Sequence, residues 1–344
     1  MGNVNNTYQN EAISGLKEAF ASILPDGYSG LADASSLSSL GPDALLGMIL
    51  GTLSERRGEV VSFFLLLFGF GILLSLCETL LGSMRGVASG GVSAAVSFGI
   101  FAAVYPLALD VSEALLGMGE FFSALVPILS SFLALGGSAG TAASASVGLG
   151  VSAWLTGLVS EKLLLPIITA IFASAAVSSS LGGASLRISG VLRRSFSRAI
   201  GVVGAITAAL FALQTYVTVA ADSVSMRAAK YAAGGMIPVV GGTVSGAVST
   251  LAGGLSSLGS IIGASSVAVI LIVALSPLVL LLLYRLAFSL CALFCEASGG
   301  TPGCISAFAS AFDALISVYV MTTIIYIFEI IILIWGGNSV LGTW

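Results

Sequence analysis

The sequence predicts an all-α polytopic membrane protein with about seven to eight transmembrane helices, some of them broken or re-entrant. Hydrophobic residues make up 57% of the chain, and charged residues make up only 8%. A soluble domain carries about 25% charged residues, because its surface faces water. Long apolar runs begin at Val60 and recur to the end of the chain. A bilayer core needs about 20 helical residues to cross it, so these runs predict a lipid-embedded chain.

The first 59 residues differ from the rest, because they are mixed and polar and contain no run long enough to span a bilayer. A short amphipathic helix is predicted near the start, where apolar residues recur at helical spacing: Ile13, Leu16, Phe20 and Ile23. A second helix is expected over Asp43–Leu53, because Pro42 suits the first turn of a helix. We therefore expect an extracytoplasmic N-terminal region over 1–59 and a helical transmembrane domain over 60–344.

The transmembrane domain divides into apolar segments separated by Gly, Ser or charged stretches. The candidate spans are Val60–Leu81, Val92–Leu109, Phe121–Leu135, Ala142–Ser160, Leu163–Leu181, Ile200–Ala221, Val239–Ile262, Val267–Tyr284 and Ile305–Trp335. The stretch Asp110–Glu120 is interpreted as an acidic connection between two spans. The segment Val239–Ile262 is the doubtful span, because it is rich in Gly and Ser. The last segment is longer than one crossing needs, so it tilts or begins outside the bilayer core.

Basic residues predict the orientation. The stretch Ser185–Arg198 holds four arginines and no acidic residue, so it is expected in the cytoplasm. It is either a loop or an amphipathic helix lying in the interface. Counting crossings outward places the N-terminal region, the Asp110–Glu120 connection and the C-terminus on the opposite side.

Several kinds of chemistry are excluded by residues that are missing. The chain has no histidine, and its four cysteines form no CxxC pair, so no metal site and no cofactor are predicted. Phosphate-binding loops of the GxxxxGK[ST] type and HExxH motifs are also absent, and no Ser-His-Asp set can form without a histidine. We therefore predict that the chain is not an enzyme, and that energy comes from a partner or a gradient. The net charge of −4 gives no reason to expect a nucleic-acid partner.

Small residues predict close helix packing. Glycines four residues apart recur, as in Gly136/Gly140 and Gly242/Gly246. Such spacing lets membrane helices approach closely, either within one chain or between copies in a homo-oligomer.

Three polar side chains inside apolar segments are candidate intramembrane sites: Gln214, Asp313 and Glu329. Glu329 stands in a long apolar run without a basic neighbour, so it must face a polar cavity, pair with a distant basic residue or be protonated. The two interpretations are a polar pathway and interhelical hydrogen bonding.

The stretch Arg227–Gly246 is the candidate functional element. Its distinctive residues are Arg227, Lys230, Gly234, Gly235, Pro238, Gly241 and Gly242. Arg227 and Lys230 lie one helical turn apart, the paired glycines permit a break, and Pro238 starts a new segment. A broken basic element at membrane depth is tolerated where it lines a cavity or packs on protein. The alternative is a plain loop before an interfacial helix.

The pattern Arg-x-x-Lys-x-x-x-Gly-Gly-x-Ile-Pro-Val-Val-Gly-Gly over Arg227–Gly242 resembles the signature of the stage III sporulation protein AE family. The likeness extends to the polar N-terminal region, the apolar spans and the Ser276–Leu278 segment. The resemblance implies a multi-pass protein of the mother-cell membrane around the forespore, within a channel-like complex that supports forespore development. It also implies partners: the other membrane proteins of the same sporulation operon, including a secretion-type ATPase.

Two functions follow from the sequence. The first is a membrane component of that secretion-like conduit, which fits the scarce mid-membrane charge and abundant glycine. The second is a self-contained permease that passes small molecules across the membrane.

Overall fold

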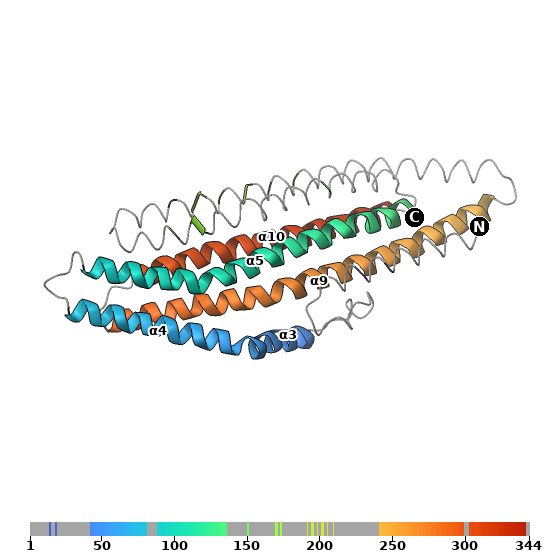
Figure 1. Ribbon diagram of the computed structural model, residues 1–344. Helices are drawn as coiled ribbons and strands as arrows, with labels where there is room; N and C mark the ends of the chain where they lie inside the picture. Colours follow the sequence, from blue (N-terminus) through green and yellow to red (C-terminus); the bar gives the residue numbers. More distant parts are fainter. Residues whose placement is uncertain are drawn as a thin grey trace.

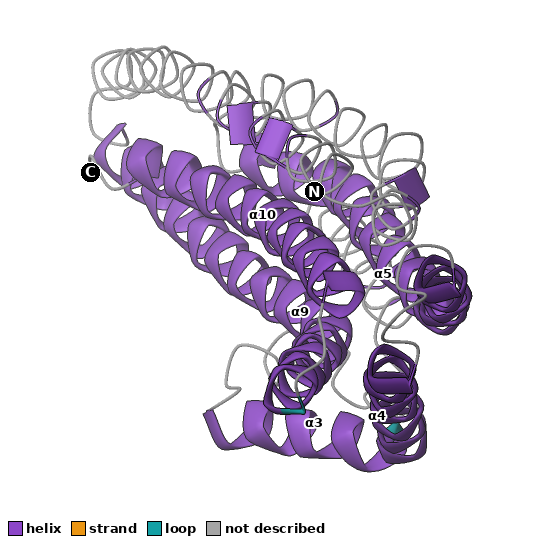
Figure 2. Ribbon diagram, turned by 90° about the vertical axis from the view of Figure 1, so that its left-hand side faces the viewer, coloured by secondary structure: helices purple, strands orange, loops and turns teal. Residues whose placement is uncertain are grey.

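The computed structural model describes four continuous ranges of the chain, 42–80, 88–135, 241–298 and 303–341, together with a few helical residues elsewhere. The elements in these ranges are all helices: α3 (Pro42–Glu55), α4 (Arg57–Leu80), α5 (Ala88–Leu135), α9 (Gly241–Ala297) and α10 (Gly303–Leu341). Figure 1 shows α4, α5, α9 and α10 running side by side along one axis, and Figure 2 shows helix without strand in the same ranges.

The four long helices form two antiparallel hairpins whose turns lie at the same end of the bundle (Figure 1). Residues 81–87 connect α4 to α5, and a short stretch after Ser298 connects α9 to α10. The Ser75 hydroxyl donates a hydrogen bond of 3.4 Å to the Ser298 carbonyl, which joins the ends of α4 and α9.

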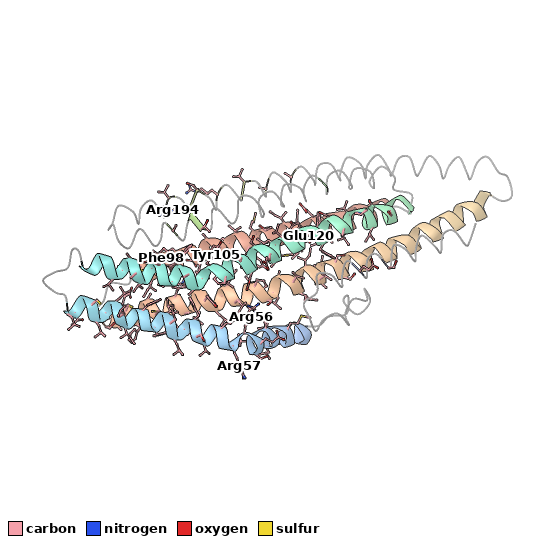
Figure 3. The ribbon with its side chains drawn as sticks, in the orientation of Figure 1. Arg56, Arg57, Phe98, Tyr105, Glu120 and Arg194 are labelled. Carbon is pink, nitrogen blue, oxygen red and sulfur yellow. The ribbon has the colours of Figure 1, made fainter. Side chains whose placement is uncertain are left out.

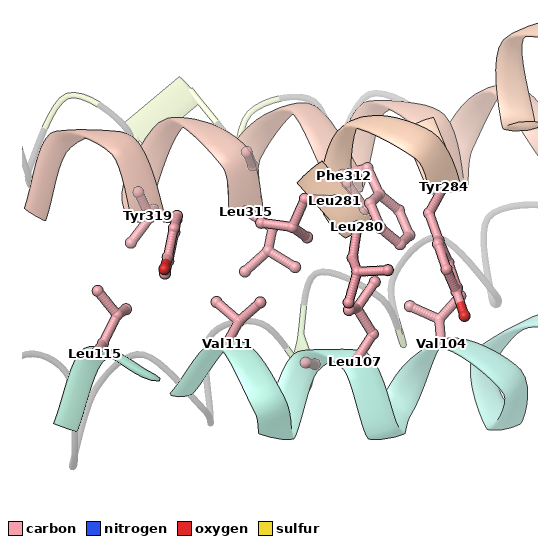
Figure 4. Packing of buried hydrophobic residues seen from close by; sticks show 14 of the residues in the cluster. Val104, Leu107, Val111, Leu115, Leu280, Leu281, Tyr284, Phe312, Leu315 and Tyr319 are labelled. Atoms are coloured by element: carbon pink, nitrogen blue, oxygen red, sulfur yellow. The ribbon is translucent and has the colours of Figure 1, made fainter. Parts of the chain in front are cut away.

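The core lies between α5 and the α9–α10 hairpin. Val104, Leu107, Val111 and Leu115 recur at helical spacing on one face of α5 and are buried. In Figure 4 they face buried side chains of the other hairpin, which are Leu280, Leu281, Tyr284, Phe312, Leu315 and Tyr319. Burial of these apolar side chains holds the hairpins together.

Helix α4 lies at the edge of this core. It buries Phe63 and Leu67 against the bundle, but large apolar side chains on its other face stay exposed, among them Leu65, Leu73 and Leu80. Such a face suits contact with lipid rather than water.

Four helices in the described ranges are long and apolar enough to cross a membrane: Arg57–Cys77, Gly91–Ile128, Ser265–Ala297 and Gly303–Ile331. This agrees with the predicted all-α membrane-type fold, and α3 and α4 lie within a few residues of their predicted positions. The count of seven to eight spans is not confirmed. The expected spans Ala142–Ser160, Leu163–Leu181 and Ile200–Ala221 lie outside the continuously described ranges.

The predicted break at Asp110–Glu120 is wrong, because α5 runs without interruption from Ala88 to Leu135. The acidic residues Glu113 and Glu120 are exposed on one face of the helix, while Val111, Leu115 and Met118 are buried on the other. This amphipathic pattern continues the helix, since acidic residues break no helix when their side chains can leave the core. The 48 residues of α5 extend about 72 Å.

The predicted separation of Val239–Ile262 from Val267–Tyr284 is also wrong, because residues 241–262 of the first segment and all of the second belong to the single helix α9. Gly and Ser disfavour helices in water but are frequent in membrane helices, where close packing compensates. Pro277 lies inside α9. The 57 residues of α9 extend about 86 Å, well beyond one bilayer core.

The predicted orientation stays a prediction, and the count of crossings behind it changes because α5 replaces two expected spans. In the Ser185–Arg198 stretch the structure describes Val191, Arg194, Ser195 and Arg198, all helical and exposed. These residues agree with the helical alternative for that stretch. The domain division at residue 59 likewise stays a prediction.

Candidate functional site

Arg56 lies at the junction of α3 and α4 and makes the first charged contact between helices. Its Nη1 donates to Oε2 of Glu59 at 2.9 Å and to Oδ2 of Asp110 on α5 at 3.4 Å. The hydrogen bond to Glu59 is the largest cause of a raised pKa of Arg56. Figure 3 shows Arg56 on the side of α4 that faces the bundle. The contact fixes the start of α4 against the middle of α5.

Arg285 and Asp313 make the second charged contact, between α9 and α10. The Arg285 Nε donates to Oδ1 of Asp313 at 2.6 Å, and Nη2 donates to Oδ2 at 3.2 Å. Nη1 of the same guanidinium donates to the Ser289 hydroxyl. The ion pair is bidentate, because two guanidinium nitrogens of Arg285 donate to the two carboxylate oxygens of Asp313. Arg285 and Asp313 lie in two apolar candidate spans, where each charged side chain needs a partner.

Aromatic rings connect these contacts. Tyr284, beside Arg285, stacks on Phe63 of α4 with ring centroids 4.0 Å apart, and on Phe312 of α10 at 6.2 Å. Phe312 in turn precedes Asp313. The aromatic layer therefore ties α4, α9 and α10 together next to the ion pair.

Three buried thiols occupy the space nearer the hairpin turns. Cys291 donates to the Leu67 carbonyl at 3.2 Å, and Cys295 donates to the Gly71 carbonyl at 3.7 Å. The Cys304 sulfur lies 2.8 Å from the Ser97 hydroxyl. All three are free thiols. In the part of the chain that the structure describes, no group of three potential ligands could hold a metal ion.

Glycines allow the closest helix approaches. A Cβ on Gly71 of α4 would lie 2.9 Å from the Cys291 sulfur, and one on Gly99 of α5 would lie 2.6 Å from Phe70. A Cβ on Gly119 would lie 2.9 Å from the hydroxyl of Tyr326 on α10. Sequence spacing missed these three glycines, because each faces its partner singly rather than as a Gly-xxx-Gly pair.

A buried polar layer lies farther along α9 and α10. On α10 it contains Thr322, Thr323 and Glu329, whose side chain is only 1% exposed, and on α9 it contains Ser265 and Ser266. The two helices are antiparallel, with Asp313 beside Arg285 and the Tyr319 hydroxyl on the Ala274 carbonyl at 3.1 Å. Continuing this register brings Glu329 level with the two serines. The layer is the most polar part of the described core.

The predicted site residues are only partly brought together. Gln214 and five residues of the broken element, Arg227, Lys230, Gly234, Gly235 and Pro238, lie outside the described residues. Gly241 and Gly242 are the first two residues of α9. Asp313 and Glu329 both lie on α10, but they are 16 positions apart, which corresponds to about 24 Å of helix, so they belong to separate contacts.

Both a family model and a curated protein match the chain. The family model for stage III sporulation protein AE matches residues 42–337. A curated protein of Bacillus subtilis (strain 168), stage III sporulation protein AE, is 24% identical over 233 residues. The aligned stretch covers 66% of this chain and 58% of that relative. No solved structure matches the chain.

Proposed function

Because the chain belongs to the stage III sporulation protein AE family, we propose that it is a membrane component of a channel-like, secretion-related complex between mother cell and forespore. The observation that carries this proposal is the family match, which includes all four long apolar helices. In this proposal the chain lies in the mother-cell membrane around the forespore, where the complex supports forespore development.

The architecture supports a component of an assembly. Helices α5 and α9 are about 72 and 86 Å long and apolar over most of their length, whereas a bilayer core is about 30 Å thick. The apolar surface that extends past one bilayer core needs cover from protein. Other copies of this chain and the other membrane proteins of the same operon supply that cover.

Energy for transport would come from another chain. The sequence holds no phosphate-binding loop, and a secretion-type ATPase encoded with it would supply the work. No catalytic role and no cofactor are assigned to this chain.

A self-contained permease is the second candidate function. The observation that favours it is the buried polar layer at Glu329, since polar groups in a membrane core often mark substrate or ion sites. A permease would accumulate a solute in liposomes on its own, and Glu329→Gln would abolish that uptake.

Co-purification from sporulating cells tests the proposed function. The full chain carries an affinity tag, membranes are solubilised in mild detergent, and bound proteins are quantified by mass spectrometry. A second tagged multi-pass protein of the same membrane serves as the control. We expect the other membrane proteins of the operon and the ATPase to be enriched with this chain alone. Equal recovery with both baits would reject the proposal.

A further inference from the structure

The outward face of α5 carries a regular polar stripe. Pro106, Glu113, Glu120 and Pro127 follow one another at intervals of seven residues, and all four are exposed. Seven residues are close to two helical turns, so these side chains lie on one face. Glu120 is labelled on α5 in Figure 3. We call these four residues the α5 stripe.

The stripe is as long as a bilayer core is thick. Pro106 and Pro127 are 21 residues apart, which corresponds to about 32 Å of helix, against a hydrocarbon core of about 30 Å. The whole stripe lies inside the candidate span Gly91–Ile128. Its neighbours on the same face, Ala102 and Ala124, are small and exposed.

The exposed face of α4 is different in kind. It presents large apolar side chains, which are Leu65, Leu66, Ile72, Leu73, Leu76 and Leu80. That surface is suited to lipid. The α5 stripe offers carboxylates where α4 offers leucine, so the two faces meet different surroundings.

The energy of a charge in lipid decides what surrounds the stripe. A carboxylate in the middle of a bilayer costs at least about 2.5 kcal/mol, and two of them cost more. Neither Glu113 nor Glu120 forms an ion pair with another residue in the part of the chain that the structure describes. Water therefore suits this face better than lipid.

The two prolines also leave backbone carbonyl oxygens without their helical hydrogen bonds. A proline cannot donate the helical hydrogen bond to the carbonyl four residues earlier, so Pro106 and Pro127 release the carbonyls of Ala102 and Ser123. Both of these residues are exposed. Such freed carbonyls are tolerated at membrane depth where they line a water-filled cavity. The stripe thus combines carboxylate and carbonyl oxygens and contains no basic side chain.

We propose that the α5 stripe lines a water-filled path across the membrane and that Glu113 and Glu120 draw cations into it. The proposal rests on the proposed function, because several chains are needed to close a path around one helix face. Rings of acidic side chains are how pores favour cations over anions. The class of solute favoured is therefore cationic, from inorganic ions to small organic cations.

Thiol accessibility tests the path. Single cysteines replace Glu113 and Glu120 of the stripe and their neighbours Ala102 and Ala124 on the same face, and these are the four stripe variants. Leu66 and Leu73 on the lipid-suited face of α4 serve as matched controls. The full-length variants are made in sporulating cells, and membranes are treated with membrane-impermeant methanethiosulfonates, one cationic and one anionic. The unsubstituted chain supplies the background from its native thiols.

We expect all four stripe variants to react and both α4 controls to stay unmodified. Unreactive stripe variants would overturn the proposal, because lipid or protein would then cover the face. Reaction at Glu113→Cys and Glu120→Cys alone would overturn it as well, since the acids would then lie at a membrane surface.

The preference for cations has a separate test. In the Glu120→Cys variant the cationic reagent should react several-fold faster than the anionic one, and adding Glu113→Gln should lower that ratio. Adding Glu296→Gln, at an exposed carboxylate of α9 outside the stripe, should leave the ratio unchanged. Equal rates for both reagents would refute the attraction of cations. Co-purified partners together with an unreactive stripe would leave the proposed function standing and remove only this inference.

Discussion

At the residue scale, single glycines set how closely the helices approach. Gly71 faces the Cys291 and Cys295 sulfurs, whereas Gly69, two residues earlier on α4, is exposed and has nothing within 4 Å of an added Cβ. The two positions share a helix and a residue type but differ in contact. They therefore form a matched pair for measuring the packing.

Gly71→Ala should destabilise the protein by about 1–3 kcal/mol, because the new methyl group would displace two hydrogen-bonded thiols in a filled core. Gly69→Ala should be neutral or stabilising by up to about 1 kcal/mol, since alanine favours helix. Thermal unfolding of the detergent-solubilised variants measures both. A Gly71→Ala protein as stable as Gly69→Ala would show that α4 does not pack closely on α9.

Single residues also show which parts of the candidate site can be predicted from the sequence. Asp313 and Glu329 were recognisable, because an acidic residue in a long apolar run is unusual. Their partners were not, since the contact of Arg285 with Asp313 depends on how α9 and α10 align. The contacts at Gly71, Gly99 and Gly119 were equally hidden, because any glycine in a helix looks alike until its neighbour is known.

At the element scale, the Arg285–Asp313 contact fixes the register of α9 against α10. Arg285→Gln or Asp313→Asn alone leaves one charge without its partner, whereas the double variant removes both. We expect the double variant to lose less stability than the two single losses added together, with a coupling of about 0.5–3 kcal/mol. Equilibrium unfolding of the four proteins gives this value.

The Arg56–Glu59 pair is the control for that cycle, because its residues are only three positions apart and its side chains are the more exposed, at 42% and 58% against 30% and 45% for Arg285 and Asp313. Its coupling should stay at or below about 1 kcal/mol, as for surface ion pairs. Equal couplings for the two pairs would mean that the α9–α10 contact is no more than a surface interaction.

The sequence predicts a helix well where the whole element is apolar. It predicts a helix poorly where the hydrophobicity changes along the element. Helix α4 was foreseen because Val60–Leu81 is apolar throughout. From composition alone, the acidic middle of α5 and the Gly- and Ser-rich start of α9 predict interruptions. Both are continuous helix, since one face of each element packs while the other accepts polar or small residues.

At the scale of the whole molecule, two hairpins longer than a bilayer core is thick form a bundle with lipid-suited and polar outer faces. A bundle of this kind fits a component of a larger assembly better than a protein working alone. We therefore expect several chains together to form the working unit.

Native mass spectrometry of the purified full-length chain, extracted in mild detergent, measures whether the chain assembles. We expect discrete assemblies, as multiples of the 34.5 kDa chain or with the membrane proteins of its operon. The same preparation is placed in liposomes to look for solute uptake without other chains. A strictly monomeric protein that accumulates a solute in those liposomes would contradict the account.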